Sequence, residues 1–257
     1  MADLSAFART AAPLPEGEWI GLLPGSKPAK LSVGMPFLLE TADRLARLRP
    51  NSRFLLPIAP TTSEEELIRF AGESNPIARS YGAAVGQCRD GLLVTQAGTT
   101  IRLLKEHPAH GPLSQCALAL TTVGANTAEL GALGVPMIVI VPTQHLAVMQ
   151  AWDGAIGLLA RLPLLRRLVG GLLSLWRLRN NGLMAWPNIS AGRVVVPERV
   201  GEITPQQIAE EAADWLAAPE RLQGQRDDLQ ALRGQPGAVA ALAEEVRQLL
   251  PRQLESA

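Results

Sequence analysis

The stretch TTVGANTAELGALGVPMIVIVP, residues 121–142, brings a glycine, a helix start and a buried strand into direct succession. It follows the apolar run CALAL at 116–120, so Gly124 comes at the carboxyl end of an expected strand. The segment GVPMIVIVP at 134–142, rich in β-branched residues, is typical of a strand buried on both faces. Strand, helix and strand in this order predict one βαβ unit of a parallel sheet.

Strand and helix patterns alternate along the rest of the chain. We expect strands at 19–26 and 52–60, a hairpin closed around Ala97–Gly98, a helical turn and short strand within 111–120, and helices over 35–50, 63–73, 204–232 and 237–250. The fold class that follows is α/β, a Rossmann-like parallel sheet with helices on both faces.

Composition limits the classes of function. The chain has 257 residues, 24 basic and 24 acidic, and a formal net charge of +0, so we expect no nucleic-acid partner. The start of the chain lacks the apolar core of a signal peptide, and no uncharged apolar run reaches the length of a membrane span. Cys88 and Cys116 form no CxxC pattern and fit a reducing cytosol. We expect a flexible tail over 1–18 and a single domain over 19–257.

Gly124, Asn126 and Glu129 lie where an open parallel sheet binds its ligands. The free backbone N–H groups and the positive dipole end of a helix attract anions, and a glycine lets a diphosphate approach the backbone. Glu129 falls about one and a half turns into the helix, where its carboxylate can accept hydrogen bonds from ribose hydroxyls. The alternative is an ordinary Asn-capped helix whose glycine allows close packing on the sheet.

A second strand end, LLPGSKPAK at 22–30, places Gly25, Ser26 and Lys27 after an apolar run. Small residues and a cation suit a phosphate or a sugar hydroxyl, although a plain Pro-Gly turn is equally open. Neither turn has the GxxxxGK[ST] or GxGxxG spacing, so no nicotinamide or flavin cofactor is expected. His107 and His110 flank Pro108 without a third ligand, so we expect no metal.

The third stretch is MAWPNISAGRVVVPERV at 184–200, which we expect to be a loop. Trp186-Pro187-Asn188 cannot lie inside a helix, because proline lacks the N–H and clashes with the preceding turn. Asn188 and Ser190 then place polar groups beside apolar neighbours. The alternative is a structural loop in which Asn188 turns the chain.

In this order the three stretches resemble lipid-A-disaccharide synthase and its relatives among the two-domain (GT-B) glycosyltransferases. IGLLPGSKPAK is similar to the family's LLPGSR, GANTAELGALGVPMIVIV to SGTATLE…PMVV, and WPNISAGRVVVPE to LPNLLAGR…VPE. The similarity covers roughly residues 19–250 and corresponds to the carboxyl-terminal, donor-binding half of the family. The PN-x-x-AGR pattern is the most specific of the three.

The resemblance implies inverting transfer of a hexose from a UDP-sugar to a lipid-linked acceptor, without a bound metal or other cofactor. It implies a nucleotide-sugar-binding domain over 19–257, with diphosphate and sugar contacts, a ribose contact at Glu129, and a side chain on the donor side of the cleft. The implied diphosphate and sugar contacts are Gly25, Ser26, Lys27, Gly124, Ala125, Asn126 and Thr127. The implied ribose contact is Glu129, and the implied side chain on the donor side of the cleft is Asn188. The catalytic base stays unassigned.

The chain departs from the family pattern in three respects. The family has arginine where this chain has Lys27, and Ser-Gly-Thr where it has Val123-Gly124-Ala125; Asn126 and Thr127 offer polar groups in their place. The family's amino-terminal half, with the acceptor site and the base, has no counterpart in the matching region. The alternatives are therefore a fragment, half of a two-chain enzyme, or a non-catalytic sugar-nucleotide-binding subunit that needs a separate acceptor-binding chain.

A basic, leucine-rich segment, 154–183, stands apart in composition. We expect short helices that lie in an anionic membrane interface, which also suits a lipid-linked acceptor and disfavours a soluble epimerase of similar architecture. The expected membrane contacts are Arg161, Arg166, Arg167, Trp176, Arg177 and Arg179. The alternatives are a helix hairpin packed on the sheet, and a face that docks the acceptor half. The expected location is cytoplasmic, peripheral on the inner face of a membrane.

Overall fold

A computed structural model describes residues 12–72, 74–81, 86–89, 91–145, 182–233 and 238–249. Within these ranges eight strands form one sheet in the order β3-β4-β5-β2-β1-β6-β7-β8. The strands are β1 (Glu18–Leu23), β2 (Ser52–Pro57), β3 (Gly86–Arg89), β4 (Leu92–Thr95), β5 (Thr100–Leu104), β6 (Leu118–Thr122), β7 (Met137–Pro142) and β8 (Glu198–Gly201).

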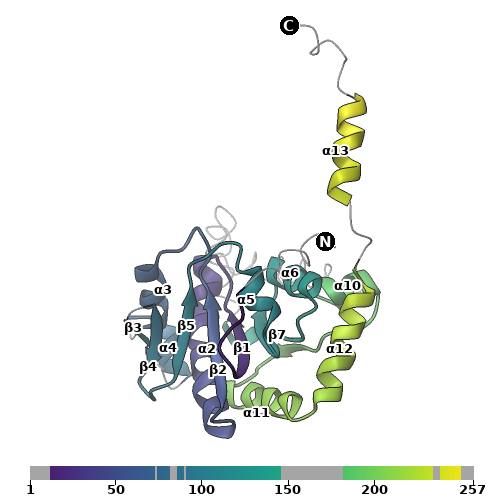
Figure 1. The fold of residues 1–257 in the computed structure, drawn as a ribbon. Coiled ribbons are helices and arrows are strands. Elements are labelled where there is room, and N and C mark those ends of the chain that lie inside the picture. Colours follow the sequence, from purple (N-terminus) through teal and green to yellow (C-terminus); the bar gives the residue numbers. More distant parts are fainter. Residues whose placement is uncertain are drawn as a thin grey trace, which may run out of the picture.

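The helices of the described part connect these strands or cover them, apart from α13 (Figure 1). They are α2 (Pro28–Leu48), α3 (Glu64–Ala71), α4 (Pro76–Ser80), α5 (His110–Ser114), α6 (Ala125–Leu133), the 3₁₀ turn η1 (Thr143–His145), α10 (Trp186–Ala191), α11 (Pro205–Leu216), α12 (Pro219–Ala231) and α13 (Ala238–Leu249).

The sheet is mostly parallel, as the sequence predicts. The six strands from β5 through β2, β1, β6 and β7 to β8 are parallel to one another. At one edge, β4 pairs antiparallel with both β5 and β3. The hairpin of β4 and β5 contains the expected glycine turn, in which Gly98 adopts a φ of 87°. Strand β3 was not expected, and neither was β8, most of which lies in the stretch 184–200 that was predicted to be a loop. The α/β class and the Rossmann-like sheet are confirmed.

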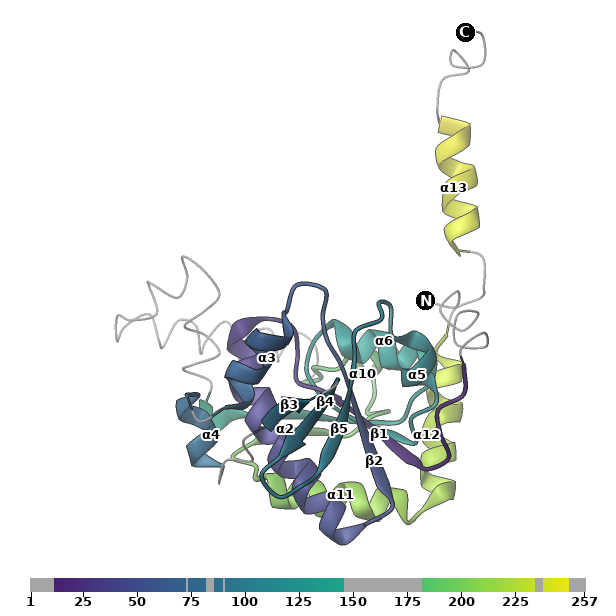
Figure 2. The same cartoon turned by 60° about the vertical axis from the view of Figure 1, so that its left-hand side comes forward.

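Side chains alternate between two cores, one on each face of the sheet. In β1, Ile20 and Leu22 belong to the core under α2 and α11, while Trp19 and Leu23 belong to the core under α5, α6, α10 and α12. Figure 1 and Figure 2 show the two layers of helices on either side of the strands. Helices on both faces are therefore confirmed, and they keep the parallel strands away from water.

Helix α2 begins at Pro28, seven residues before the predicted start at 35. The prediction placed Pro36 in the first helical turn, where proline is tolerated. In the structure Pro36 lies inside the helix and leaves the Ser32 carbonyl without its usual N–H donor. Asn75 replaces that donor, since its Nδ2 lies 2.7 Å from Ser32 O.

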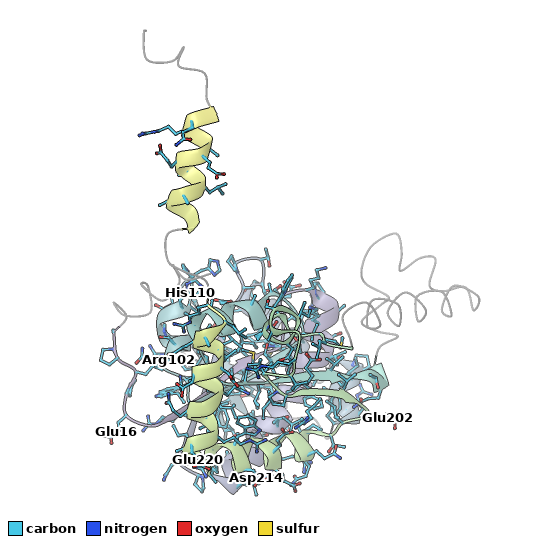
Figure 3. The ribbon with its side chains drawn as sticks, turned by 90° about the vertical axis from the view of Figure 1, so that its right-hand side faces the viewer. Glu16, Arg102, His110, Glu202, Asp214 and Glu220 are labelled. Atoms are coloured by element: carbon cyan, nitrogen blue, oxygen red, sulfur yellow. The ribbon has the colours of Figure 1, made fainter. Side chains whose placement is uncertain are left out.

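Two helices share the region predicted as helix over 204–232. α11 ends at Leu216 and α12 begins with Pro219, which cannot continue the preceding helix. The helix expected over 237–250 is present as α13, which extends away from the sheet (Figures 1 and 3).

Two expectations fall wholly or partly outside the described residues. Residues 1–11 are not described, but the next part of the expected tail contacts the folded body: Leu14 N donates to Gln115 Oε1 and Trp19 Nε1 donates to Pro15 O. The basic segment 154–183 lies outside the described residues except for its last two positions, and so do all six expected membrane contacts. In the described ranges, no helix combines the length and apolar character needed to cross a membrane.

Candidate functional site

The two predicted glycine turns meet at one edge of the sheet, between β1 and β6. These strands are hydrogen-bonded neighbours, but the chain leaves β1 through α2 toward β2 and leaves β6 through α6 toward β7 on the other side. A strand order that diverges in this way opens a crevice at the carboxyl ends of the strands, where α/β sheets bind ligands.

Glycine is required at both turns by backbone geometry and by space. Gly25 has a φ of 102° and Gly124 a φ of 155°, both in a region that side chains disfavour. A Cβ atom on Gly25 would lie 2.8 Å from Lys30 Cβ, and one on Gly124 would lie 2.9 Å from Lys30 Nζ. Any other residue would displace the Lys30 side chain.

A cavity of about 270 Å³ opens beside these turns. Four residues predicted from the sequence line it: Gly25, Ser26, Asn126 and Glu129. The opposite wall comes from the segments after β2 and β5, with Pro57, Ile58, Ala59, Pro60, Thr61, Glu106, His107 and Ala109. The structure thus brings together polar groups from both turns in one concave site.

Glu129 is oriented by a neighbour that the sequence interpretation considered only as a metal ligand. His110, the first residue of α5, places its Nε2 3.0 Å from Glu129 Oε1, and its side chain is 12% exposed. Its Nδ1 is buried without a hydrogen-bond partner in the described structure. Figure 3 labels His110 on the body of the protein. The pair restrains the Glu129 carboxylate at the cavity wall.

Two further residues at this edge, Lys30 and Thr122, were missed. Lys30 lies in the first turn of α2, and its Nζ donates to Val123 O at 2.7 Å, which links the two turns. Thr122, the last residue of β6, is 7% exposed, and its Oγ1 has no hydrogen-bond partner in the described structure. A predicted helix start at Pro28 would have placed Lys30 in the first helical turn, one turn after Lys27, and would have made Lys30 a candidate site residue.

Five of the nine predicted residues do not line the cavity: Lys27, Gly124, Ala125, Thr127 and Asn188. Lys27 and Ala125 are exposed at the starts of α2 and α6. Thr127 is buried, where its Oγ1 donates to Gly124 O at 2.8 Å and accepts from Trp186 N at 3.1 Å. Thr127 therefore connects the start of α6 to α10.

Asn188 is fully buried and lies in a helix, so the loop prediction is wrong for residues 186–191. Trp186 and Pro187 form the first turn of α10, where proline is allowed. Asn188 Nδ2 donates to Val196 O and to Glu198 Oε1, and Asn188 Oδ1 accepts from the N–H groups of Val195 and Val196. These bonds occupy the amide with residues 195–198, and Asn188 is not among the residues that line the cavity.

Glu198 completes this buried network. Its carboxylate accepts hydrogen bonds from the N–H groups of Met184 and Ala185, just before α10, as well as from Asn188. Gly192 ends the helix with a φ of 64°. The asparagine and glutamate of the WPNISAGRVVVPE stretch therefore hold α10 in place against the segment that leads into β8.

The described ranges contain no group of three or more His, Cys, Asp or Glu side chains that could hold a metal ion. The expectation that the reaction needs no metal stays a prediction.

The chain is similar to curated lipid-A-disaccharide synthases over most of its length. It is 28% identical over 238 residues to the lipid-A-disaccharide synthase of Myxococcus xanthus, covering 90% of this chain and 49% of the relative. The resemblance to the lipid-A-disaccharide synthases is confirmed. The synthase of Nitrosococcus oceani is 26% identical over 222 residues, covering 86% of this chain and 45% of that one. The chain thus spans about half the length of the curated synthases it matches.

No model of a protein family matches the chain. Among solved structures, the C-terminal CMP-Kdo binding domain of WaaA from Acinetobacter baumannii is similar, with a TM-score of 0.42 and 12% identity, over 90% of this chain and 94% of that domain.

Proposed function

We propose that this chain is the donor-binding part of a glycosyltransferase that takes a UDP-hexose and transfers the hexose, with inversion, to a lipid-linked acceptor. The observation that carries the proposal is the meeting of Gly25, Ser26, Asn126 and Glu129 around one cavity at the divergence of the strands. The names of the curated relatives support the class of reaction.

The nucleoside occupies the cavity in this proposal. The Glu129 carboxylate accepts hydrogen bonds from the ribose hydroxyls while His110 keeps it oriented toward the cavity. The diphosphate lies over the start of α6, where Gly124 leaves the backbone open and Asn126 adds a polar side chain. Ser26, exposed at the cavity edge, is available to the phosphate or to the sugar.

An inverting transfer needs a base for the acceptor hydroxyl and a stabiliser for the leaving nucleotide. The start of α6 supplies the stabiliser, because its N–H groups and dipole favour the negative charge that develops on the diphosphate. We propose that the base belongs to an acceptor-binding half, which is either a further part of the same polypeptide or a separate partner chain. The match to about half of each relative supports this placement.

Contact with the inner face of a membrane is part of the proposal, and the arginines of the 154–183 segment support it. The wild-type chain should cosediment with vesicles that contain anionic lipids. A variant with Arg161, Arg166 and Arg167 replaced by glutamate should remain in the supernatant. Sedimentation of both proteins alike, or of neither, would contradict membrane binding through these arginines.

Binding of UDP, measured by isothermal titration calorimetry, tests the donor site. We expect the wild type to bind, and Glu129→Ala to weaken binding roughly 10- to 100-fold, since a hydrogen bond to a charged group contributes about 1.5–3 kcal/mol. Glu245→Ala, on the distant helix α13, is the control for loss of one carboxylate.

The outcomes separate the alternatives. Failure of the wild type to bind UDP would contradict the proposed donor site. Equal binding by the wild type and Glu129→Ala would contradict the ribose contact. Binding without turnover, in the presence of lipid acceptor and an acceptor-binding half, would identify a non-catalytic sugar-nucleotide-binding subunit instead.

A further inference from the structure

The positive charge beside the two glycine turns is carried by a lysine one helical turn after the position at which the family pattern has arginine. Lys27, at the family's arginine position, is exposed and outside the cavity wall. Lys30 is half-buried, and its ammonium group lies 2.7 Å from Val123 O, beside the turn that follows β6. A positive charge is therefore present between the two turns, carried by a different residue.

A hydroxyl is present at the same edge, also at a shifted position. The family pattern has hydroxyls at positions 123 and 125, where this chain has Val123 and Ala125. Thr122 Oγ1 lies 3.4 Å from the position of a Cβ on Gly25, so it faces the first turn. It is buried and has no hydrogen-bond partner in the described structure, which is unfavourable unless a ligand provides one.

The glycines fit this arrangement. A side chain on Gly25 would collide with the stem of Lys30, and one on Gly124 with its ammonium group. Both glycines thus keep open the position of Lys30 as well as the path of a ligand. Lys30, Thr122, Gly25 and Gly124 surround one small region that adjoins the nucleoside cavity at Gly25.

We propose that Lys30 and Thr122 form an anion-binding pair for the diphosphate of a nucleotide sugar. The inference rests on the proposed function for the identity of the ligand. Lys30 supplies the charge that the family draws from arginine at position 27, and Thr122 supplies a hydroxyl in place of those at positions 123 and 125.

Three variants and three ligands test the pair. Lys30→Met keeps the alkyl chain and removes the charge, Lys27→Met removes the same charge one turn away, and Thr122→Val removes the hydroxyl at nearly constant volume. UDP and inorganic pyrophosphate are titrated by calorimetry, and uridine, which lacks phosphate, by nuclear magnetic resonance.

The expected result is selective. Lys30→Met should weaken UDP and pyrophosphate binding roughly 10- to 100-fold and leave uridine binding unchanged, because only the phosphates lose a charge-assisted contact. Lys27→Met should change UDP binding far less. Thr122→Val should bind UDP more weakly while its unfolding midpoint rises, since a buried unpaired hydroxyl is removed.

The failures are distinguishable. If Lys30→Met binds UDP as tightly as the wild type, the pair is wrong and the donor site stands. If Lys30→Met loses uridine as well, Lys30 has only a structural role and the pair is wrong. If the wild type binds pyrophosphate through Lys30 but neither UDP nor uridine, the pair stands and the proposed function fails. If the wild type binds none of the three, both are wrong.

Discussion

At the scale of single residues, Asn188 contributes to stability through bonds that the sequence does not reveal. Replacement by alanine leaves the N–H groups of Val195 and Val196 and the carbonyl of Val196 without their partner. We expect Asn188→Ala to lower the free energy of unfolding by about 2–4 kcal/mol in urea titrations. Ser190→Ala, at an exposed position of the same helix, is the control. A change in Asn188→Ala as small as in the control would contradict the buried network.

The site residues that could be predicted are those that follow a strand directly. Gly25, Ser26, Asn126 and Glu129 were found because strand ends and helix starts are visible in the sequence, and strand ends of a parallel sheet meet at one edge. Lys30 was missed because its helix was expected to begin later. Thr122 belongs to an apolar strand, and only the fold shows that its hydroxyl lacks a partner.

At the scale of elements, the interior proline of α2 depends on a side chain from outside the helix. Asn75 donates to Ser32 O and to Phe70 O, and its Oδ1 caps α4. Asn75→Ser keeps a capping oxygen but cannot reach both carbonyls. We expect it to lower the free energy of unfolding by about 1–3 kcal/mol, and by less in a Pro36→Ala background, where residue 36 regains its N–H. A double-mutant cycle measures this coupling, and strict additivity would contradict it.

The start of α11 allows a second prediction at this scale. Thr204 and Gln207 form a reciprocal capping box, in which each side chain accepts from the other residue's backbone N–H. Thr204→Ala should cost about 0.5–2 kcal/mol of stability, whereas Thr204→Ser should cost little. Thermal unfolding followed by circular dichroism gives both values. Equal losses in the two variants would show that the hydroxyl does not cap the helix.

Element boundaries were harder to predict than element types. Six of the eight described strands follow from short apolar runs, whereas β3 and β8 were missed. The start of α2 and the helix α10 were missed because both contain proline in places where sequence rules end or forbid a helix. In α2 a tertiary contact from Asn75 supplies the hydrogen bond that Pro36 removes, whereas Pro187 lies in the first turn of α10, where proline removes no intrahelical hydrogen bond.

At the scale of the whole molecule, Cys116 reports on the integrity of the sheet. It is fully buried in the core under α5 and α6, and burial raises the pKa of its thiol to about 12. The unfolded chain loses this proton near pH 8.5, so between that pH and about 12 the unfolded state binds fewer protons and stability falls as pH rises.

The expected slope is about 1.4 kcal/mol per pH unit from this group. The difference in unfolding free energy between the wild type and Cys116→Ala should therefore shrink from pH 8.5 to pH 9.5, and stay constant from pH 6 to pH 7. Urea titrations at these pH values measure it. A difference that does not change with pH would mean that the thiol ionises as readily in the native state.

The topology of the sheet also determines when each edge of β1 is paired during synthesis of the chain. β1 pairs with β2 soon after both are synthesised, but its other edge pairs with β6, roughly a hundred residues later. At about 5–20 residues per second, the ribosome needs on the order of 5–20 s to supply that partner. During this interval β1, which is buried from Trp19 to Leu23 in the folded protein, presents an unpaired edge, a feature that favours aggregation and chaperone capture. The β1–β6 pairing that brings the two glycine turns together is therefore also unprotected during a long interval of translation.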